Sequence, residues 1–359
     1  MKILMIYKDS NKDKPFFTHD KKVDDKNISG GGEMFCKTIY KIFNNVDVYQ
    51  IPPSYDHDLS IQEKQKVSKK IIDRANDINA DIIISNFSHA IHNGKVMQKS
   101  NIPVMQIVHN FDLFPSMVSR LNGLTNNNHS VFFVSKFQKK YYDRMSNRMK
   151  APEILVTDYI NSDYCKKPKK MYDKVWDCGT IGRCNKQKNP FLLKKMLEGS
   201  KLSNIIITSY DGNKWDKNYY EKNKNNSDVL WDLKHDKVLE NISKCGSYFS
   251  TWDMETYGIT ALEALSCGLP IILNSHKSGE HASEIIPASK NHYKLIPKDD
   301  KDALISAIKS FENVDRKEIQ EMTMEKHSLQ KWKSHFANCI DKTIDNFKTK
   351  NNNLQRFMK

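Results

Sequence analysis

The sequence lacks any long apolar run, and this limits where the protein can work. No stretch of it approaches the roughly 20 apolar residues that a membrane span needs. Its first residues, MKILMIYKDSNKDKP, turn polar too early for a secretory signal. We therefore expect a protein that stays in the cytoplasm, or in the host cytoplasm if its source is viral.

Cysteine and histidine are present, but not in the spacings that metal or disulfide sites require. The seven cysteines are an odd number without a CxxC pair, which favours free thiols in a reducing compartment. His235, His276 and His281 are scattered without ligand spacing. No Gly-x-Ser-x-Gly motif or Cys/His arrangement indicates acyl transfer. These absences argue against a disulfide framework, a zinc site and an acyl-transfer enzyme.

Arginine is scarce, and lysine supplies most of the positive charge. The chain has 50 lysines and 7 arginines, with a formal net charge of +14. Such a balance, together with many asparagines, can come from AT-rich coding alone. Residues 136–170 nevertheless contain ten basic residues against four acidic ones, a net +6. This segment is either a surface that attracts polyanions such as nucleic acid or an anionic membrane, or a solvated lysine face.

The length and the apolar pattern predict two α/β domains. The 359 residues exceed the roughly 250 to 300 at which one hydrophobic core stops growing. Short apolar runs alternate with amphipathic stretches, which is typical of parallel strands connected by helices. Strands are expected at 2–7, 46–51, 81–86, 103–109, 131–135, 153–157, 175–181, 204–209, 247–251, 269–274 and 293–296. Helices are expected at 32–44, 61–78, 136–148, 190–199, 235–245, 259–267, 301–312 and 316–347.

Prolines and charges in residues 162–174 break this rhythm and predict a linker. We expect a Rossmann-like, doubly wound domain at 1–165, a second one at 171–325, and a C-terminal helix at 326–349 that returns to the first domain. Ligands of such sheets bind at the carboxyl ends of the strands, so two domains of this kind predict a cleft between them. The tail after residue 347 is rich in Lys and Asn and is expected to fray.

The stretch METYGITALEALSCGLPIIL combines a potential anion site with two carboxylates. It reads as a loop after a strand, then a short helix, then the next strand. The first helical N–H groups, at Ile259 and Thr260, lack intrahelical partners and can bind a diphosphate. Gly258 would let the backbone approach closely. Glu255 and Glu263, eight residues apart, can accept hydrogen bonds from hydroxyl groups.

A carboxylate on each side of an anion site suits a ligand with both a diphosphate and hydroxyl-bearing rings, which is a nucleotide sugar. Alone, the stretch also fits an ordinary strand, loop and helix, ended by Gly268, with surface glutamates. A second motif, TIGRCNKQKNP, supports the nucleotide sugar. Its Arg183 and Lys188, five residues apart, follow the first strand of the second domain and can bind phosphate oxygens.

Together these motifs resemble the donor site of family 4 glycosyltransferases, which are retaining enzymes of the GT-B fold. Members of that family have a Gly-Arg pair with Lys five residues after the Arg, then two Glu residues with seven residues between them. Here the motifs are GRCNKQK and ETYGITALE. The resemblance implies two Rossmann-like domains facing across a cleft, and a nucleotide-sugar donor that we expect to be UDP-linked. It also implies an enzyme that needs no metal and no cofactor.

Other segments resemble the family too. ISGGGEMF resembles its N-terminal glycine loop, and VMQIVHNF resembles its strand that ends in a histidine facing the transferred sugar. Without the resemblance, a glycine triplet is only a flexible loop, and a lone histidine after a strand is more often structural. Two departures are the missing glycine after Glu284 and a bulkier turn, SYDGNKW, where the family has a glycine-rich one.

The resemblance assigns roles to particular residues. The expected catalytic residues are Glu255, Arg183, Lys188 and His109. The expected donor-binding residues are Gly31, Gly32, Gly182, Tyr257, Gly258, Ile259, Thr260 and Glu263. Within this set, Glu263 is expected on the nucleotide ribose and Glu255 on the donor sugar. Asp56 and Asp58 have the Asp-x-Asp spacing of metal sites in the other large glycosyltransferase fold, but they precede a polar helix, which favours a solvated turn and a helix cap.

The acceptor does not follow from the fold or the donor site. Our leading hypothesis is a hydroxymethylated base, 5-hydroxymethylcytosine, in double-stranded DNA, as in phage enzymes that glycosylate their own genomes. The DNA contacts would come from Lys136, Lys139, Lys140, Arg144 and Arg148. Stacking on an extruded base could come from Phe137, Tyr141 or Tyr142. The alternatives are a cell-envelope or capsular polysaccharide acceptor, and a noncatalytic nucleic-acid-binding protein. The oligomeric state is not indicated.

Overall fold

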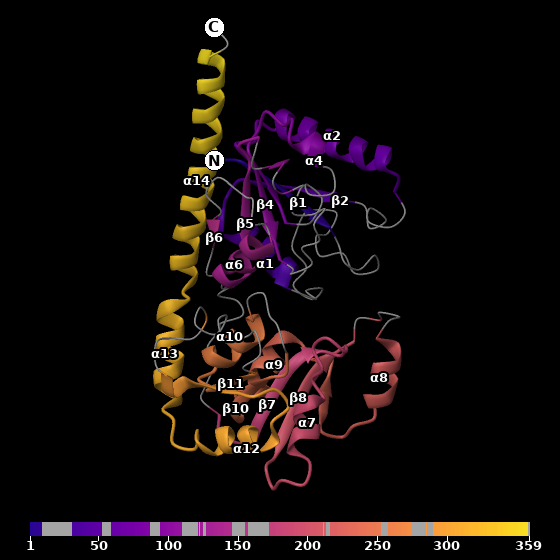
Figure 1. The fold of residues 1–359 in the computed structure, drawn as a ribbon, viewed down its shortest axis with the longest axis vertical. Helices are drawn as coiled ribbons and strands as arrows, with labels where there is room; N and C mark the ends of the chain where they lie inside the picture. Colours follow the sequence, from indigo (N-terminus) through magenta and orange to yellow (C-terminus); the bar gives the residue numbers. More distant parts are fainter. Residues whose placement is uncertain are drawn as a thin grey trace. The chain divides into compact units, whose positions relative to one another are not determined.

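A computed structural model describes the chain in two compact units (Figure 1). The structure describes residues 1–8, 31–51, 59–86, 94–109, 121, 123–124, 127–145, 155–156, 172–210, 212, 216–252, 258–274, 285 and 290–357, without the side chains of 8, 31–34, 94–95, 141–145, 155–156, 290 and 350–357. Unit 1 comprises Met1–Tyr159 and Gln330–Lys359, and unit 2 comprises Ile160–Leu329. The sequence places the corresponding boundaries a few residues away, at 165, 171 and 325.

Unit 1 contains a six-stranded sheet in the order β2-β1-β3-β4-β5-β6. Its strands are β1 (Ile3–Lys8), β2 (Val46–Ile51), β3 (Ile82–Ser85), β4 (Val104–Val108), β5 (Ser130–Phe133) and β6 (Leu155–Val156). Every neighbouring pair is parallel. All the strands that the apolar runs predict for this half of the chain are confirmed, with small shifts at their ends.

Helices cover both faces of this sheet. They are α1 (Gly31–Ile42), α2 (Ile61–Asp77), α4 (Gly94–Met97), α6 (Lys136–Met145) and α14 (Leu329–Phe357). On one face, Ile6 packs in a core with Ile71 of α2. On the other face, Phe132 of β5 and Phe35 of α1 contact Phe336 of α14, with ring centroids 5.4 and 5.5 Å apart. Because strand side chains alternate, this arrangement buries both faces, as a doubly wound sheet requires. Figure 1 shows α14, in yellow, running beside the strands of its unit.

A capping box sets the start of α2. The backbone amide of Ser60 donates to Glu63 Oε2 at 2.8 Å, and the amide of Glu63 donates to Ser60 Oγ at 3.3 Å. The hydrogen bond from Ser60 lowers the pKa of the Glu63 carboxyl. A cap of this kind contributes about 1 kcal/mol to helix stability. The helix therefore begins where the sequence predicts it, with Ser60 as the cap, whereas Asp56 and Asp58 lie outside the described residues.

Unit 2 contains a second parallel sheet, in the order β12-β11-β10-β7-β8-β9. Its strands are β7 (Trp176–Arg183), β8 (Asn204–Ser209), β9 (Val229–Trp231), β10 (Cys245–Ser250), β11 (Ile271–Asn274) and β12 (Tyr293–Ile296). The sequence predicts all of these except β9. That strand is only three residues long and stands among polar residues, so it leaves no apolar run to detect.

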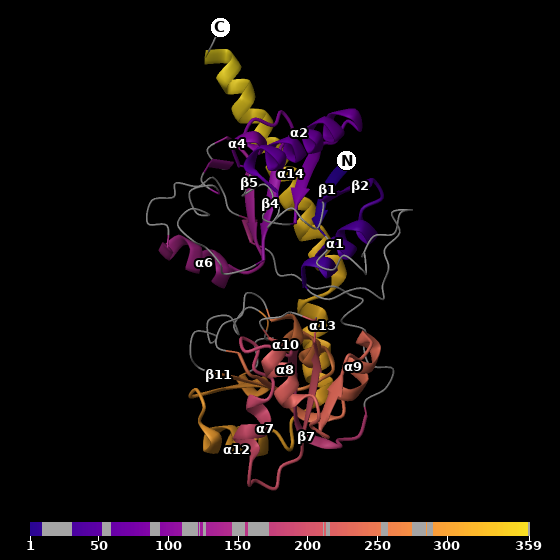
Figure 2. The same ribbon diagram turned by 90° about the vertical axis from the view of Figure 1, so that its right-hand side faces the viewer.

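Helices cover both faces of the second sheet as well (Figure 2). They are α7 (Leu192–Leu197), α8 (Lys217–Asn223), α9 (His235–Ile242), α10 (Ile259–Ser266), α12 (Lys301–Lys309) and α13 (Arg316–Lys326), with a 3₁₀ turn η3 (Lys290–His292). Leu193 of α7 and Leu304 of α12 share a core with Phe249 of β10. Helices α9 and α10 pack against the sheet as well, and α13 packs on α10. The sequence misses α8, which buries none of its residues and so has no apolar face.

The C-terminal region differs from the prediction in two ways. The expected single helix over 316–347 is wrong, because α13 ends at Lys326 and α14 begins at Leu329. Between them, His327 leaves the helical conformation with φ −114°, and its Nε2 donates to the carbonyl oxygen of Ile285 at 2.8 Å. The expected fraying after residue 347 is also wrong, because α14 continues to Phe357. None of the helices described here is both long and apolar enough to cross a membrane.

The described cysteines are free thiols, as predicted. They are Cys36, Cys178, Cys184, Cys245, Cys267 and Cys339, and all are buried. Burial raises the pKa of the Cys178 thiol to about 12, and burial beside Asp216 and Asp232 raises the pKa of Cys184 to about 11. Both thiols therefore stay protonated at neutral pH and are poor nucleophiles.

Buried His129 makes unit 1 sensitive to acid. Its Nδ1 accepts a hydrogen bond from the amide of Val104 at 3.2 Å, and its ring stacks on Phe347 with centroids 5.3 Å apart. Burial lowers the pKa of His129 from 6.5 to about 4. Between these pH values the unfolded chain binds a proton that the folded chain does not. We expect His129 to contribute a fall of about 1.4 kcal/mol per pH unit in the stability of unit 1 as the pH drops through this window, in addition to any contribution from other buried histidines.

Urea unfolding at several pH values across the same window measures this slope. His129→Asn is the informative variant, because its amide oxygen can still accept from the Val104 amide but does not titrate. We expect the pH slope of the variant to be shallower by about 1.4 kcal/mol per pH unit. Equal slopes for the variant and the wild type would show that another group carries the acid sensitivity.

Candidate functional site

The order of strands in unit 2 defines where a ligand should bind. Strand β7 lies between β8 and β10, and it is parallel to both. The chain leaves β7 toward β8 on one side and later returns to β10 on the other, so the strand order reverses beside β7. In open parallel sheets, ligands bind outside the carboxyl ends of the strands at such a reversal. The residues that end β7 and β10 are therefore the first candidates.

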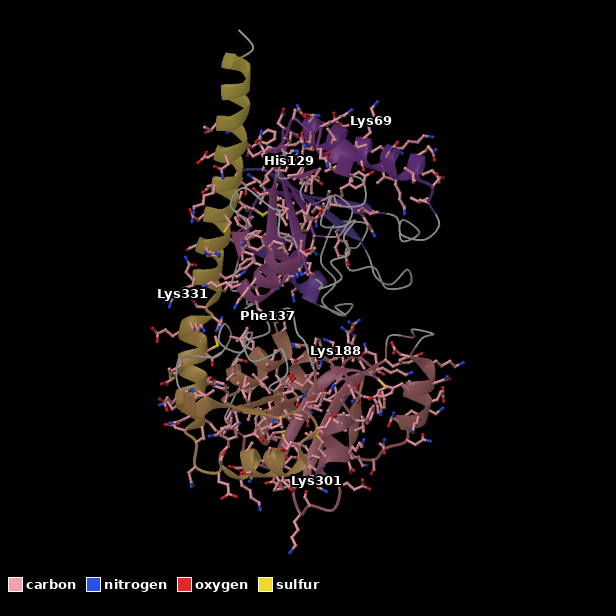
Figure 3. The ribbon with its side chains drawn as sticks, in the orientation of Figure 1. Lys69, His129, Phe137, Lys188, Lys301 and Lys331 are labelled. Atoms are coloured by element: carbon pink, nitrogen blue, oxygen red, sulfur yellow. The ribbon has the colours of Figure 1, made fainter. Side chains whose placement is uncertain are left out.

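The loop after β7 is held against the end of β10. The amide of Lys188 donates to Asn185 Oδ1 at 2.7 Å, and Thr251 Oγ1 donates to the carbonyl oxygen of Lys188 at 2.5 Å. The Lys188 ammonium group lies over the ring of Trp252, which is buried and directly follows Thr251. Lys188 is labelled in Figure 3. A cation over an indole ring is stabilised by about 0.5 to 2 kcal/mol. The contact holds the positive charge of Lys188 at the carboxyl edge of the sheet.

Gly182 lies in the same cluster, and Arg183 ends the strand beside it. A Cβ built at Gly182 would lie 3.5 Å from Lys188 Cβ and 3.9 Å from Trp252 Nε1, so these residues pack together. Arg183 is the last residue of β7 and is exposed to solvent. The structure thus brings Gly182, Arg183 and Lys188 to one place. Trp252 was not expected there, because no motif in the sequence marks it.

Helix α10 follows β10, the parallel neighbour of β7, and so begins at the same edge of the sheet. It starts at Ile259, as predicted, and its cap residue Gly258 is left-handed with φ 85° and ψ 47°. Glycine offers no side chain to cap the helix, and the first amides of a helix, here those of Ile259 and Thr260, are groups that can bind an anion. Thr260 Oγ1 lies 2.9 Å from the hydroxyl of Tyr248, which joins the first turn of α10 to β10.

Glu263 lies one turn further along α10 and is buried. Its side chain is 5% exposed, and its Oε1 lies 2.9 Å from Nε2 of His235, the first residue of α9. In the sequence, His235 is one of three scattered histidines without ligand spacing. No signal in the sequence could have paired the two residues, because they are 28 positions apart on different helices.

Some predicted residues cannot be placed. Glu255 and Tyr257 lie outside the described residues, so their proximity to Glu263 stays a prediction. Arg148 and Glu284 also lie outside them. The backbone of Arg144 belongs to α6, but its side chain is not among those described.

The turn that departs from the family pattern introduces aromatic rings. Tyr210, which follows β8, stacks on Tyr220 of α8 with ring centroids 4.3 Å apart. Tyr220 in turn meets Trp231, the last residue of β9, edge to face at 5.2 Å. Tyr210 follows β8 and Trp231 ends β9, its parallel neighbour, so this ring cluster lies at the carboxyl edge of the sheet.

In unit 1, His109 follows β4 and faces α1. Its Nε2 lies 2.6 Å from Asn86 Oδ1, and its ring meets that of Phe35 edge to face at 5.5 Å. Burial lowers the pKa of His109 to about 4, so the ring is neutral at physiological pH. Because Asn86 Oδ1 can only accept, Nε2 carries the proton and Nδ1 is left as an acceptor. Gly31 and Gly32 open the same helix α1, one turn before Phe35.

Four of the five predicted acceptor contacts, all except Arg148, lie on α6. Lys136 and Lys140 are exposed and Lys139 is partly exposed. Phe137 is only 7% exposed, so the idea that it stacks on an extruded base is wrong. Its ring packs in the core, which is the usual fate of an aromatic residue at helical spacing. The side chains of Tyr141 and Tyr142 lie outside the described set.

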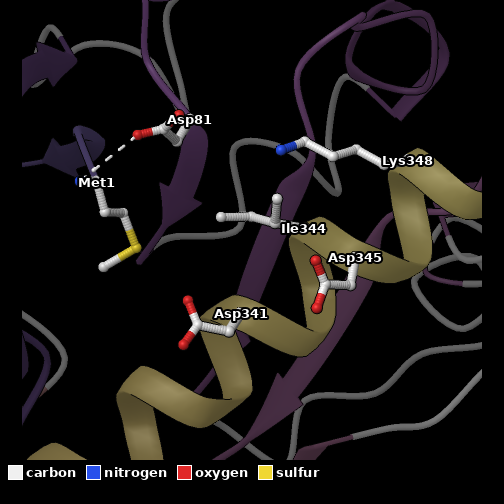
Figure 4. Close-up of a pocket in the computed structure, with 6 residues that line it drawn as sticks. All are labelled: Met1, Asp81, Asp341, Ile344, Asp345 and Lys348. Carbon is white, nitrogen blue, oxygen red and sulfur yellow. Dashed lines mark ion pairs between the residues drawn. The ribbon is translucent and has the colours of Figure 1, made fainter.

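A separate surface cavity of about 310 Å³ lies in unit 1 (Figure 4). It is lined by Met1, Asp81, Asp341, Ile344, Asp345 and Lys348. None of these is a predicted site residue. Within the described ranges, no group of three or more His, Cys, Asp or Glu side chains is placed to hold a metal ion.

Comparisons with known proteins agree with this geometry. The chain has the GT-B fold, an α/β fold with two Rossmann-like domains. Residues 165–326, nearly all of unit 2, match the family model described as Glycosyl transferases group 1. A comparison with curated protein sequences gave no match.

Similar solved structures match almost the whole chain. A sucrose-phosphate synthase from Thermosynechococcus elongatus has a TM-score of 0.69 and 13% identity, over 95% of this chain and 98% of that one. HepE from Anabaena, in complex with UDP and glucose, has a TM-score of 0.66 and 14% identity, over 95% and 99%. The lipopolysaccharide outer core galactosyltransferase WaaB has a TM-score of 0.62 and 15% identity, over 95% and 99%. At these identities the likeness establishes the fold.

Proposed function

We propose that the chain is a retaining glycosyltransferase that moves a sugar from a nucleoside diphosphate sugar, UDP-linked, to a hydroxyl acceptor without a metal ion. One observation carries the proposal. Arg183 ends β7, Lys188 follows it, and α10 follows the paired parallel strand β10, so two cations and a helix N-terminus share the carboxyl edge of the sheet in unit 2. The family match of this unit and the UDP bound to HepE support the same ligand.

The arrangement suits the charge that develops during transfer. The acceptor oxygen bonds to the anomeric carbon, the bond from that carbon to the diphosphate breaks, and the acceptor proton leaves with the diphosphate. Negative charge builds on the leaving diphosphate. Fixed donors aimed at such charge are usually the largest catalytic contribution. Arg183, Lys188 and the amides near Thr260 would supply them in place of a metal.

The remaining roles come from the resemblance. Glu263 would accept hydrogen bonds from the nucleotide ribose, and Glu255 would bind hydroxyls of the donor sugar. Neutral His109 offers Nδ1 as an acceptor for a sugar hydroxyl, and its low pKa keeps that acceptor available at physiological pH. Gly31 and Gly32 would let the start of α1 approach the donor closely.

For the acceptor, we propose a hydroxymethylated base in double-stranded DNA. The exposed Lys136 and Lys140 of α6 support it, because lysines near a duplex bind phosphates. A glycan acceptor is the second candidate. The fold shared with WaaB, a lipopolysaccharide galactosyltransferase, favours that candidate.

One experiment tests the donor and both acceptors. The protein is incubated with a panel of nucleotide sugars, alone and with DNA that contains 5-hydroxymethylcytosine, with unmodified DNA of the same sequence, or with lipopolysaccharide. Release of nucleoside diphosphate is measured, with and without EDTA. We expect release from a UDP sugar that depends on the hydroxymethylated DNA and persists in EDTA, and a product that keeps the anomeric configuration by NMR.

Each other outcome has a definite meaning. Release that requires lipopolysaccharide would replace the DNA acceptor with a glycan. Loss of release in EDTA would overturn metal independence. DNA binding without any binding of nucleotide sugars would mean that the chain is a noncatalytic nucleic-acid-binding protein, and the proposed function would be wrong.

A further inference from the structure

We infer that His235 is a positioning residue that orients Glu263 toward the nucleotide, so that the site favours a ribonucleoside diphosphate over its deoxy counterparts. The inference rests on the proposed function, because it assigns the nucleotide ribose to Glu263. What is new is the dependence of that contact on a histidine from a neighbouring helix. It arises from the hydrogen bond between His235 Nε2 and Glu263 Oε1, at 2.9 Å.

Burial makes this hydrogen bond important for Glu263. The glutamate side chain is 5% exposed, while the histidine side chain is 30% exposed. A buried carboxyl group is costly unless it is hydrogen-bonded, and a carboxylate can only accept hydrogen bonds. His235 Nε2 therefore donates to Oε1. A carboxylate has two oxygens, so Oε2 remains as the acceptor for a ligand hydroxyl.

The two helices that carry this pair are joined at a second point. At the other end of α10, the thiol of Cys267 lies 3.8 Å from the carbonyl oxygen of Leu239 in α9. Helix α10 is thus held to α9 at Glu263 and again one turn later. His235 is the first residue of α9 and its cap residue, Lys234, makes no side-chain capping bond. The His235 side chain thus connects the start of α9 to α10 through Glu263.

Orientation of Glu263 has a consequence for nucleotide choice. A ribose offers two vicinal hydroxyls as donors, and a carboxylate with one oxygen already occupied presents the other in a fixed direction. A site built to accept a hydroxyl rejects an analogue that lacks it, because its buried polar group is left unpaired. We expect the wild-type protein to bind UDP about tenfold more tightly than 2′,3′-dideoxyuridine diphosphate.

Two substitutions of His235 separate its hydrogen bond from its bulk. His235→Phe keeps the ring but removes the donor, whereas His235→Gln keeps an N–H donor near the position of Nε2. We expect His235→Phe to bind UDP about tenfold more weakly and dideoxyuridine diphosphate as tightly as the wild type, so that the preference disappears. The His235→Gln variant should keep most of the preference for UDP over dideoxyuridine diphosphate. Titration calorimetry gives both dissociation constants.

A double-mutant cycle tests whether His235 acts through Glu263. Glu263→Gln should remove the preference for UDP, and adding His235→Phe to it should change the UDP affinity little further, because the two residues act as one unit. Lys237→Ala is the matched control in the same helix. Its side chain is 62% exposed and pairs with Glu240, so the UDP preference should stay at the wild-type value.

The outcomes distinguish this inference from the proposed function. If His235→Phe keeps the full preference for UDP while Glu263→Gln loses it, His235 has no positioning role and the proposed function stands. Equal weakening of both ligands by His235→Phe would indicate general damage to the pocket and overturn the inference. If UDP, GDP and ADP all fail to bind the wild-type protein, the proposed function fails and takes the inference with it.

Discussion

Replacing Arg183 by alanine should lower kcat/KM for sugar transfer at least about thirtyfold, a loss of about 2 kcal/mol of transition-state stabilisation. Arg183 ends β7 at the edge where the order of strands reverses. Its guanidinium would meet the diphosphate as negative charge builds there. The effect should fall mainly on kcat, because the charge of the leaving group is larger in the transition state than in the bound donor.

A neighbouring lysine provides the control. Lys186 is exposed in the same loop and carries the same charge, but no motif assigns it to the site. Lys186→Ala should therefore retain wild-type turnover, which separates a specific contact from a general loss of positive charge. Thermal melting of both variants verifies that they are folded. Wild-type turnover by folded Arg183→Ala would remove Arg183 from the mechanism.

The second large effect concerns stability. Gly268→Ala should lower the free energy of unfolding of unit 2 by about 3 kcal/mol or more. Gly268 follows α10 with φ 77°, a left-handed conformation that L-residues adopt at a cost. A Cβ at this position would also overlap the backbone carbonyl oxygen of Arg316 and lie 3.1 Å from its carbonyl carbon.

Arg316 cannot move away easily. Its guanidinium donates to the carbonyl oxygens of Ser243 and Cys267, at 2.6 and 3.3 Å, so α13 is fixed to the ends of α9 and α10. The backbone of Arg316 is therefore held where the new methyl group would be. The overlap must be relieved by shifting α13 or α10, and both are packed in the core.

Gly199→Ala is the matched variant, because it shares the conformation without the overlap. Gly199 has φ 74°, and a Cβ built there meets nothing within 4 Å. Gly199→Ala should lower the free energy of unfolding only by the cost of the left-handed backbone conformation, about 1 kcal/mol. The urea midpoints of the two variants measure the difference, and hydrogen exchange of the β10 and β11 amides assigns it to unit 2. Equal midpoints would mean that the contact with Arg316 does not limit this turn.

Much of the fold and part of the site could be predicted because the signals are local. Alternating apolar runs gave the strands, and turn residues gave the helix ends. Gly268 is an example. Its amide donates to the carbonyl oxygen of Leu265 at 2.9 Å, and the amide of Leu269 donates to the carbonyl oxygen of Ala264 at 3.0 Å. These hydrogen bonds confirm the predicted helix end. Arg183 and Lys188 could likewise be found, because five positions in one loop suffice to bring them together.

Other features left no local signal. Strand β9 is too short to form a pattern, and the exposed helix α8 has no apolar face. The break at His327 depends on a hydrogen bond to Ile285, which is 42 positions away. Phe137 was considered for base stacking because its neighbours are basic, yet its ring is buried.

Periodicity and spacing along the chain therefore determine the class of fold, the position of helix α10 and the two cationic residues Arg183 and Lys188. These properties depend on residues within a few positions of one another. The partners of the functional side chains came from packing: Trp252 beneath Lys188, Asn86 beside His109 and His235 against Glu263. Each pair joins elements distant in sequence, and only the folded sheet and its covering helices bring such elements within a hydrogen bond or a ring contact.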